Sequence, residues 1–171
     1  MTESTTAPRP AEPRRHRAVA TLRRILEDAD PGTLAALRRA EATSPPAAFY
    51  RVTVGALDEH LPEGGRYRDA IEARWVVVVS AMASAVDFLS GVPLGEALAR
   101  AEVAEVRVLR LLEAHDAQLA DLVRHVVHQL VQKAQPFNPN DLADLVLTDG
   151  TERAQDPRRH IARNFYRHSG T

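Results

Sequence analysis

Residues 94–133 read LGEALARAEVAEVRVLRLLEAHDAQLADLVRHVVHQLVQK and carry the most regular helical pattern in the chain. In the second half of this stretch, apolar residues recur at intervals of three and four, which is the spacing of one buried face of an α-helix. The apolar positions are Leu119, Leu122, Val123, Val126, Val127, Leu130 and Val131. On the opposite face, which we expect to be exposed, lie Arg124, His125, His128 and Gln132.

The first half of the stretch has a shorter apolar stripe of the same kind. It comprises Leu94, Ala97, Leu98 and Ala101, and after Glu102 it resumes at Val106, Leu109 and Leu112. Arg100, Arg107 and Arg110 point away from this stripe. We therefore interpret residues 94–133 as two consecutive amphipathic helices at the centre of a helical domain. The question of function becomes what their outward arginines bind.

Composition predicts one all-α domain. The chain has 171 residues, 44% of them apolar, which is enough for one hydrophobic core. Only 5% of the residues are aromatic, and alanine and leucine dominate, so helix is favoured over strand. The absence of cysteine excludes disulfides, thiolate metal sites and a cysteine nucleophile.

Charge and hydropathy predict a cytoplasmic protein without a membrane partner. The N-terminus lacks the apolar segment of a signal peptide, and the longest apolar run, Trp75 to Val86, is too short to span a bilayer. The net charge is -1, yet Lys133 is the only lysine among 22 cationic residues. Arginine suits bidentate contacts with phosphate, although a GC-rich genome would produce the same preference.

Proline and glycine divide the chain into a tail and eight or nine helices. Residues 1–13 lack periodicity and are predicted to be a disordered proline-rich tail, whereas 14–171 form the helical domain. Besides the central pair, helices are expected from Arg14 to about Leu26, from Pro31 after the N-cap Asp30, over 48–60, over 66–89, from Pro139 after Asn138, and from Pro157 after Asp156. Trp75 should lie in the core. In the last helix Ile161 and Phe165 should face inward and Arg158, Arg159, Arg163 and Arg167 outward.

No arrangement of residues predicts an enzyme or a cofactor. Asp121, His125 and His128 share a helical face with metal-ligand spacing, but a fourth ligand and the HExxH glutamate are missing. The other histidines are dispersed, so no Ser-His-Asp arrangement can be assembled. Gly64-Gly65 is not part of a phosphate-loop motif. We predict a non-catalytic protein that binds no metal and no cofactor.

Arginines recur along most of the predicted helices. If folding brings even half of them to one side, they form a track for a phosphate backbone, where affinity comes from counterion release. Few aromatic residues accompany them, which favours contact with the backbone over stacking on bases.

Several short motifs resemble one family in their order and spacing. They are Leu37-Arg38-Arg39-Ala40, Ala48-Phe49-Tyr50-Arg51, residues 94–99, residues 105–112, and Arg158-Arg159 leading to Phe165-Tyr166. Over residues 14–168 the chain resembles the CasB family, the small subunit of the type I-E CRISPR Cascade complex. The resemblance implies a helical protein present in two copies in an RNA-guided complex, beside the other subunits and the crRNA. Its basic surface would help to hold target DNA and the displaced strand, while the guide reads the sequence.

The resemblance also supplies candidate backbone contacts. By motif match they are Arg38, Arg39, Arg51, Arg107, Arg124, Arg158 and Arg159, and we add Arg110 and Arg163, about one helical turn from matched positions. The chain departs from the family in its proline-rich head and in residues 90–93, where members often have a basic loop.

Two other functions compete with nucleic-acid binding. The chain could be an interaction adaptor whose arginines pair with acidic partners, and reversing Arg38, Arg39 and Arg107 to glutamate would then abolish assembly instead of target binding. A helix-turn-helix regulator would need a recognition helix with Asn or Gln among its base-facing positions, and no helix has such a set.

Overall fold

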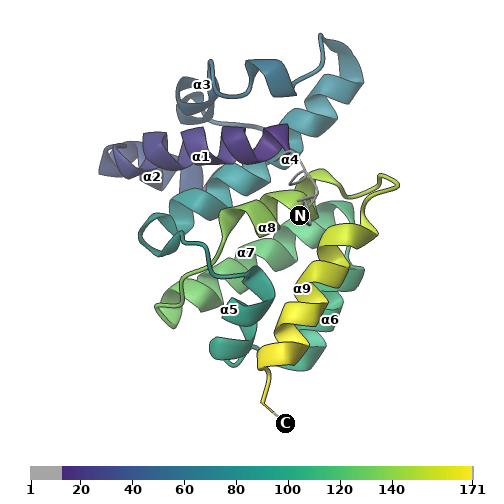
Figure 1. Ribbon diagram of the computed structural model, residues 1–171. Helices are drawn as coiled ribbons and strands as arrows, with labels where there is room; N and C mark the ends of the chain where they lie inside the picture. The colour runs from purple at the N-terminus through teal and green to yellow at the C-terminus, as the bar shows by residue number, and fades with distance from the viewer. Residues whose placement is uncertain (1–12, 171) are drawn as a thin grey trace, which may run out of the picture.

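The computed structural model describes residues 13–170, which form nine α-helices, two short 3-10 helices and no strands (Figure 1). The first helices are α1 (Arg14–Glu27), α2 (Pro31–Arg38), α3 (Ala47–Thr53), η1 (Asp58–His60), α4 (Gly65–Ser84) and η2 (Val86–Phe88). They are followed by α5 (Leu94–Arg100), α6 (Glu105–Glu113), α7 (Asp116–Gln132), α8 (Pro139–Leu147) and α9 (Gln155–His168). The predicted all-α bundle is confirmed. The predicted tail, apart from Pro13, lies outside the described residues.

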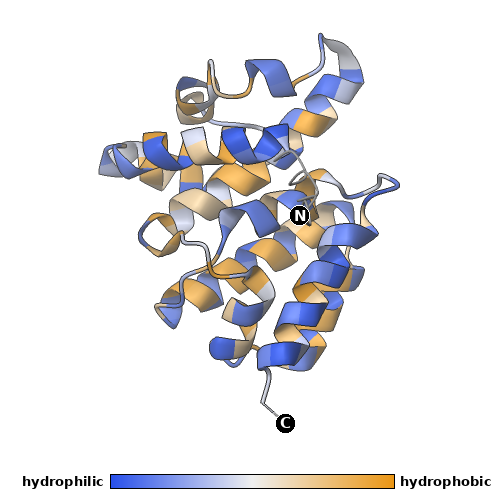
Figure 2. Cartoon of the chain, viewed as in Figure 1, coloured by the Kyte–Doolittle hydropathy of each residue, from blue (hydrophilic) through white to orange (hydrophobic). Residues whose placement is uncertain are grey.

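The long helix α4 runs through the middle of the bundle. It packs on α1, α2, α7 and α8, with α1 to α3 at one end of the molecule and α5, α6 and α9 at the other (Figure 1). Apolar faces point inward (Figure 2). Trp75 is 1% exposed, as predicted, so α4 supplies the largest side chain of the core. Among the described residues, no helix is both long and apolar enough to cross a membrane.

Local capping explains two of the predicted helix starts and contradicts a third. The side chains of Asp30 and Asn138 accept hydrogen bonds from the first-turn amides of α2 and α8, so both N-caps are confirmed. Helix α9 instead begins at Gln155, after Ala154. The predicted cap at Asp156 is wrong because this residue already lies in the first turn of the helix.

The predicted central pair is in fact three helices. Helix α5 ends at Arg100, and Glu102 takes a left-handed conformation with φ of 56°. The Glu102 amide donates to the carbonyl of Ala99 and the Val103 amide to that of Leu98, both at 3.0 Å, which is a Schellman ending. Because glycine usually occupies such a position, the sequence did not mark this break.

Two other helices are shorter than predicted. Helix α3 ends at Thr53, and Gly55, two residues later, has φ of 81°. Of the rest of the predicted 48–60 helix, only Asp58–His60 is helical, as η1. Helix α4 ends at Ser84. The chain then passes through η2, and the Ser90 amide donates to the carbonyl of Phe137 at 2.8 Å.

Helices α6 and α9 lie antiparallel at the end of the bundle opposite α1. Near the start of α6, Glu105 accepts a 2.6 Å hydrogen bond from the Tyr166 hydroxyl, near the end of α9. At the other end, the Nε of Arg158 donates to the carbonyl of Leu112 at 2.8 Å. Helix α5 packs tightly on α9, with Gly95 against the backbone of Ile161 and Phe165.

Candidate nucleic-acid interface

A basic groove lies where the C-terminal ends of α2 and α4 meet the exposed face of α7. It has a volume of about 360 Å³ and is lined by Arg38, Ser84, Arg124, His125, His128 and Val131. Arg38 is the last residue of α2 and Ser84 the last of α4, and the other four residues come from α7. Tertiary packing therefore joins two predicted contact residues that are 86 positions apart in the sequence (124 minus 38).

Each arginine of the groove is held by one backbone hydrogen bond. The Nε of Arg38 donates to the carbonyl of Ala83 at 3.0 Å, in the last turn of α4, and an Nη of Arg124 donates to the carbonyl of Ala40 at 3.3 Å. A guanidinium has five N–H donors. Most donors of both side chains therefore remain available to a ligand.

No carboxylate lines this groove, and among residues 13–170 neither Arg38 nor Arg124 forms an ion pair. Hollows elsewhere on the surface combine arginine with acid: Arg15 with Asp144, Arg74 with Asp149, and Arg17 with Glu59. No acid lines the groove of α2, α4 and α7, so its positive charge is available to a phosphate.

Two further candidates, Arg39 and Arg51, lie toward the α1–α3 end. Arg39 follows Arg38 directly as the C-cap of α2, and Arg51 lies in the last turn of α3. Both are exposed. Neither lines the groove.

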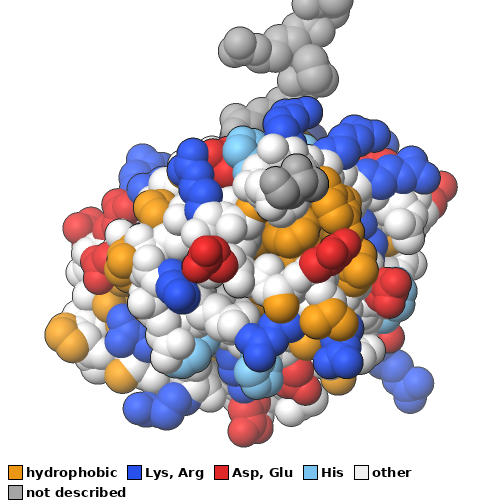
Figure 3. Space-filling model, turned by 90° about the horizontal axis from the view of Figure 1, so that it is seen from below, with side chains coloured by type: hydrophobic (Ala, Val, Ile, Leu, Met, Phe, Trp, Pro, Cys, Tyr) orange, Lys and Arg blue, Asp and Glu red, His pale blue; other side chains and the backbone are white. Residues whose placement is uncertain are grey.

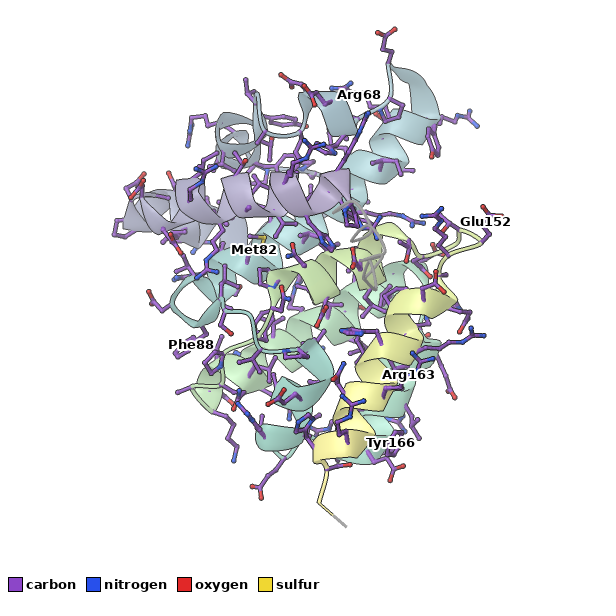
Figure 4. All side chains as sticks on the ribbon, viewed as in Figure 1. Arg68, Met82, Phe88, Glu152, Arg163 and Tyr166 are labelled. Carbon is purple, nitrogen blue, oxygen red and sulfur yellow. The ribbon has the colours of Figure 1, made fainter. Side chains whose placement is uncertain are left out.

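The remaining exposed candidates lie on α6 and α9. Arg107 and Arg110 are exposed on α6, as are Arg159 and Arg163 on α9, where Arg163 lies one turn before Tyr166 (Figure 4). Figure 3 shows basic side chains separated by acidic and uncharged ones on the face seen from below. Of the predicted arginines, Arg38 and Arg124 are the two that line the groove.

Arg158 is buried, so its predicted place on the exposed side of α9 is wrong. It is 4% exposed. Its guanidinium donates to the carbonyls of Leu112, Ala114 and Ala154, each at 2.8 Å, and to Asp149 at 3.0 Å. With these bonds made, Arg158 joins the ends of α6 and α8 to the start of α9 instead of facing a ligand.

Asp149 is the acid at the centre of this junction. Burial alone would raise its pKa, but hydrogen bonds from the Asp116 amide, His115 and Arg158 outweigh that effect and hold the pKa below its usual value. The carboxylate therefore stays ionised, and it belongs to the framework that positions α7.

The histidines of α7 are the groove residues that sequence reasoning did not assign to nucleic acid. Asp121, His125 and His128 have the spacing of metal ligands in the sequence, but among the described residues no group of three or more potential ligands could hold a metal ion. Their shared face with Arg124 was visible in the sequence. That Arg38 lies across the groove from them depends on packing between α2, α4 and α7, which no local pattern reports.

Residues 33–166 match the family model described as CRISPR-associated protein Cse2. The chain belongs to the Cse2 family. The match covers 134 of 171 residues (33 to 166 inclusive) and confirms the resemblance to the CasB family drawn from short motifs. No curated protein sequence matches the chain.

Two solved structures resemble this Cse2-family protein. One is a chain in the crystal structure of E. coli Cascade bound to a PAM-containing dsDNA target, with 22% identity, a TM-score of 0.60, and coverage of 86% of this chain and 96% of that one. The other is the crystal structure of M. ruber CasB, also with 22% identity and a TM-score of 0.60, covering 91% and 93%. At this identity the likeness shows a shared fold.

Proposed function

We propose that the protein is the non-catalytic, cytoplasmic small subunit of a type I-E Cascade complex. In that complex it contacts nucleic-acid backbone without reading sequence and stabilises target DNA that is paired to the crRNA, together with the displaced strand. Two copies per complex are expected. Family membership and the fold shared with a chain of E. coli Cascade support the assignment to the complex.

The observation that carries the nucleic-acid contact is the convergence of Arg38 and Arg124 in a groove without acids. The planar guanidinium matches the spacing of two phosphate oxygens, so two fixed groups side by side suit a polyanion. No Phe, Tyr or Trp lines the groove, so it lacks the large aromatic side chains on which bases usually stack. The geometry favours backbone contact, with sequence recognition left to the guide.

Replacement of both groove arginines by glutamine tests the proposal in the assembled complex. We expect R38Q/R124Q to assemble normally and to bind target DNA about tenfold or more weakly, since each charge-assisted hydrogen bond contributes roughly 1.5–3 kcal/mol. The matched control is R23Q/R100Q, because Arg23 and Arg100 are each paired with a glutamate four residues away, Glu27 and Glu96. Unchanged target affinity in R38Q/R124Q, with the subunit still folded, would refute the proposal.

A second function, that of a protein-interaction adaptor, is favoured by apolar exposure on α6 and α9. Val106 is 55% exposed, Leu109 39% and Tyr166 51%. If the protein acts as an adaptor through this apolar surface and not through its arginines, V106S/L109S should lose assembly, while R38Q/R124Q should keep full target binding. If the groove binds nucleic acid, R38Q/R124Q should lose target binding, and V106S/L109S should keep it.

A further inference from the structure

His125 and His128 line the groove beside Arg124, with Arg38 facing them from the end of α2. Both are exposed residues of α7, spaced so that they lie on one face of the helix. We propose that their imidazolium forms are phosphate ligands. Together with Arg38 and Arg124 they form a four-cation site for one phosphate of a nucleic-acid backbone. This inference rests on the proposed function and adds that the affinity of this site for phosphate increases as the histidines gain protons.

The hydrogen bond of His125 means that its protonation state decides whether the ring can donate to a phosphate. Its Nδ1 lies 2.7 Å from the carbonyl oxygen of Asp121, and a carbonyl can only accept, so Nδ1 carries a proton. In the neutral ring Nε2 is then an acceptor, which cannot bond to phosphate oxygens. Protonation converts Nε2 to a donor and adds a positive charge, so one proton supplies both features that a phosphate ligand needs.

The charges around the two rings favour an anion in the groove. Arg38 faces them from α2, Ser84 from α4, and Arg124 from α7 itself. The nearest acids along the chain are Asp121, one turn before His125, Glu41, just after α2, and Asp87, three residues after Ser84. None of them lines the groove. A phosphate bound beside the two rings would favour their protonated, positively charged forms.

Reciprocal linkage gives the direction of the effect. Because a bound phosphate raises the pKa of both histidines, protonation must raise the affinity for phosphate by the same factor. Histidine titrates near pH 6.5 in the absence of perturbation. Affinity should therefore rise as the pH falls through this range, beyond the constant contribution of the two arginines.

The direct test is an NMR pH titration of the histidine ring signals in the full chain, with and without a single-stranded dT oligonucleotide. Signals of His125 and His128, assigned from the single H125Q and H128Q variants, should shift to a higher pKa by about half a unit or more when the oligonucleotide is present. The ring signal of His160, which lies outside the groove near Asp141, is the internal control and should not move.

A binding measurement complements the titration. Between pH 7.8 and pH 5.8 the unmodified chain should gain about fivefold more affinity for the oligonucleotide than H125Q/H128Q does, since one pKa unit corresponds to a tenfold change. H160Q should behave like the unmodified chain. An abasic oligonucleotide should give the same gain as dT, because the ligand is the phosphate.

The outcomes separate this inference from the proposed function. If the oligonucleotide shifts the guanidinium signals of Arg38 and Arg124 while both histidine pKa values stay constant, phosphate binding by the histidines is refuted. Nucleic-acid binding by the two arginines is then still supported. If neither set of signals responds at oligonucleotide concentrations that saturate binding, both proposals are overturned.

Discussion

Arg158 and Arg159 are adjacent in the sequence but lie in opposite environments. Arg159 is exposed, whereas Arg158 is 4% exposed and donates to three backbone carbonyls and Asp149. Residues next to each other on a helix point about 100° apart, so one can face the core while the other faces solvent. A run of arginines therefore does not identify a binding surface until each side chain has been placed.

Substitution of Arg158 should destabilise the fold strongly. R158M removes the guanidinium from the buried Asp149, which keeps only His115 and the Asp116 amide as partners, and it removes the donor from three backbone carbonyls. We therefore expect a loss of about 3–5 kcal/mol in the free energy of unfolding. Urea denaturation measures this loss. The control R159M should change stability by less than about 0.5 kcal/mol. Equal stability of the two variants would show that the junction contributes nothing.

Asp149 should make stability fall in acid. Its pKa is lowered in the folded state, so its contribution is complete above the unfolded value of 3.8 and is lost as the pH falls through the folded pKa. The stability difference between the unmodified protein and D149N should be constant from pH 7 to about pH 5 and shrink below pH 3.8. Urea unfolding at a series of pH values measures it. A difference that does not change with pH would contradict this role.

The sequence predicted an exposed position correctly for some arginines and wrongly for Arg158. The motif match named Arg38 and Arg124, which the structure places in one groove, but it also named Arg158, which is buried. Residue type and order were visible in the sequence. The partners of these side chains were not visible, because they come from distant segments. Asp149, the partner of Arg158, follows α8, and Ala83, the partner of Arg38, lies in α4.

At the scale of elements, helix α5 approaches α9 closely because Gly95 has no side chain. A Cβ at this position would lie 2.0 Å from the carbonyl oxygen of Ile161 and 2.7 Å from the Phe165 nitrogen. Both are backbone atoms of α9, which cannot move without the helix. Gly95 thus sets the separation of the two helices.

Alanine at position 95 tests this contact. Helix propensity alone would favour alanine over glycine by about 1 kcal/mol. We expect the steric clash to dominate, so that G95A loses roughly 1–3 kcal/mol of stability. G91A is the matched control, because a Cβ there meets nothing within 4 Å. Thermal denaturation of the two variants decides the sign, and a G95A protein as stable as the unmodified one would mean that α5 and α9 are not in close contact.

Element type was predictable from periodicity, whereas element ends were predictable only where the chain marks them. Asp30-Pro31 and Asn138-Pro139 begin helices where expected, because their side chains and fixed φ angles act locally. The break at Glu102 was missed since a glutamate occupies the left-handed position, where tertiary packing has to compensate for its cost.

At the scale of the whole molecule, the charges nearly cancel. The chain carries 22 Lys and Arg against 23 Asp and Glu. The isolated subunit should therefore bind DNA weakly and lose it readily as salt rises. A gel-shift assay measures this, and nanomolar affinity for duplex DNA at physiological salt would contradict it. Inside an assembly, a high local concentration makes such weak contacts effective.

The salt dependence of target binding by the assembled complex tests whether the groove formed by α2, α4 and α7 contacts phosphate. Each phosphate contact that is lost should lower the slope of log affinity against log salt by about 0.9. We predict that complexes with R38Q/R124Q show both a weaker affinity and a slope shallower by about one to two, while complexes with R23Q/R100Q keep the original slope. An unchanged slope in R38Q/R124Q complexes that assemble normally would contradict the account.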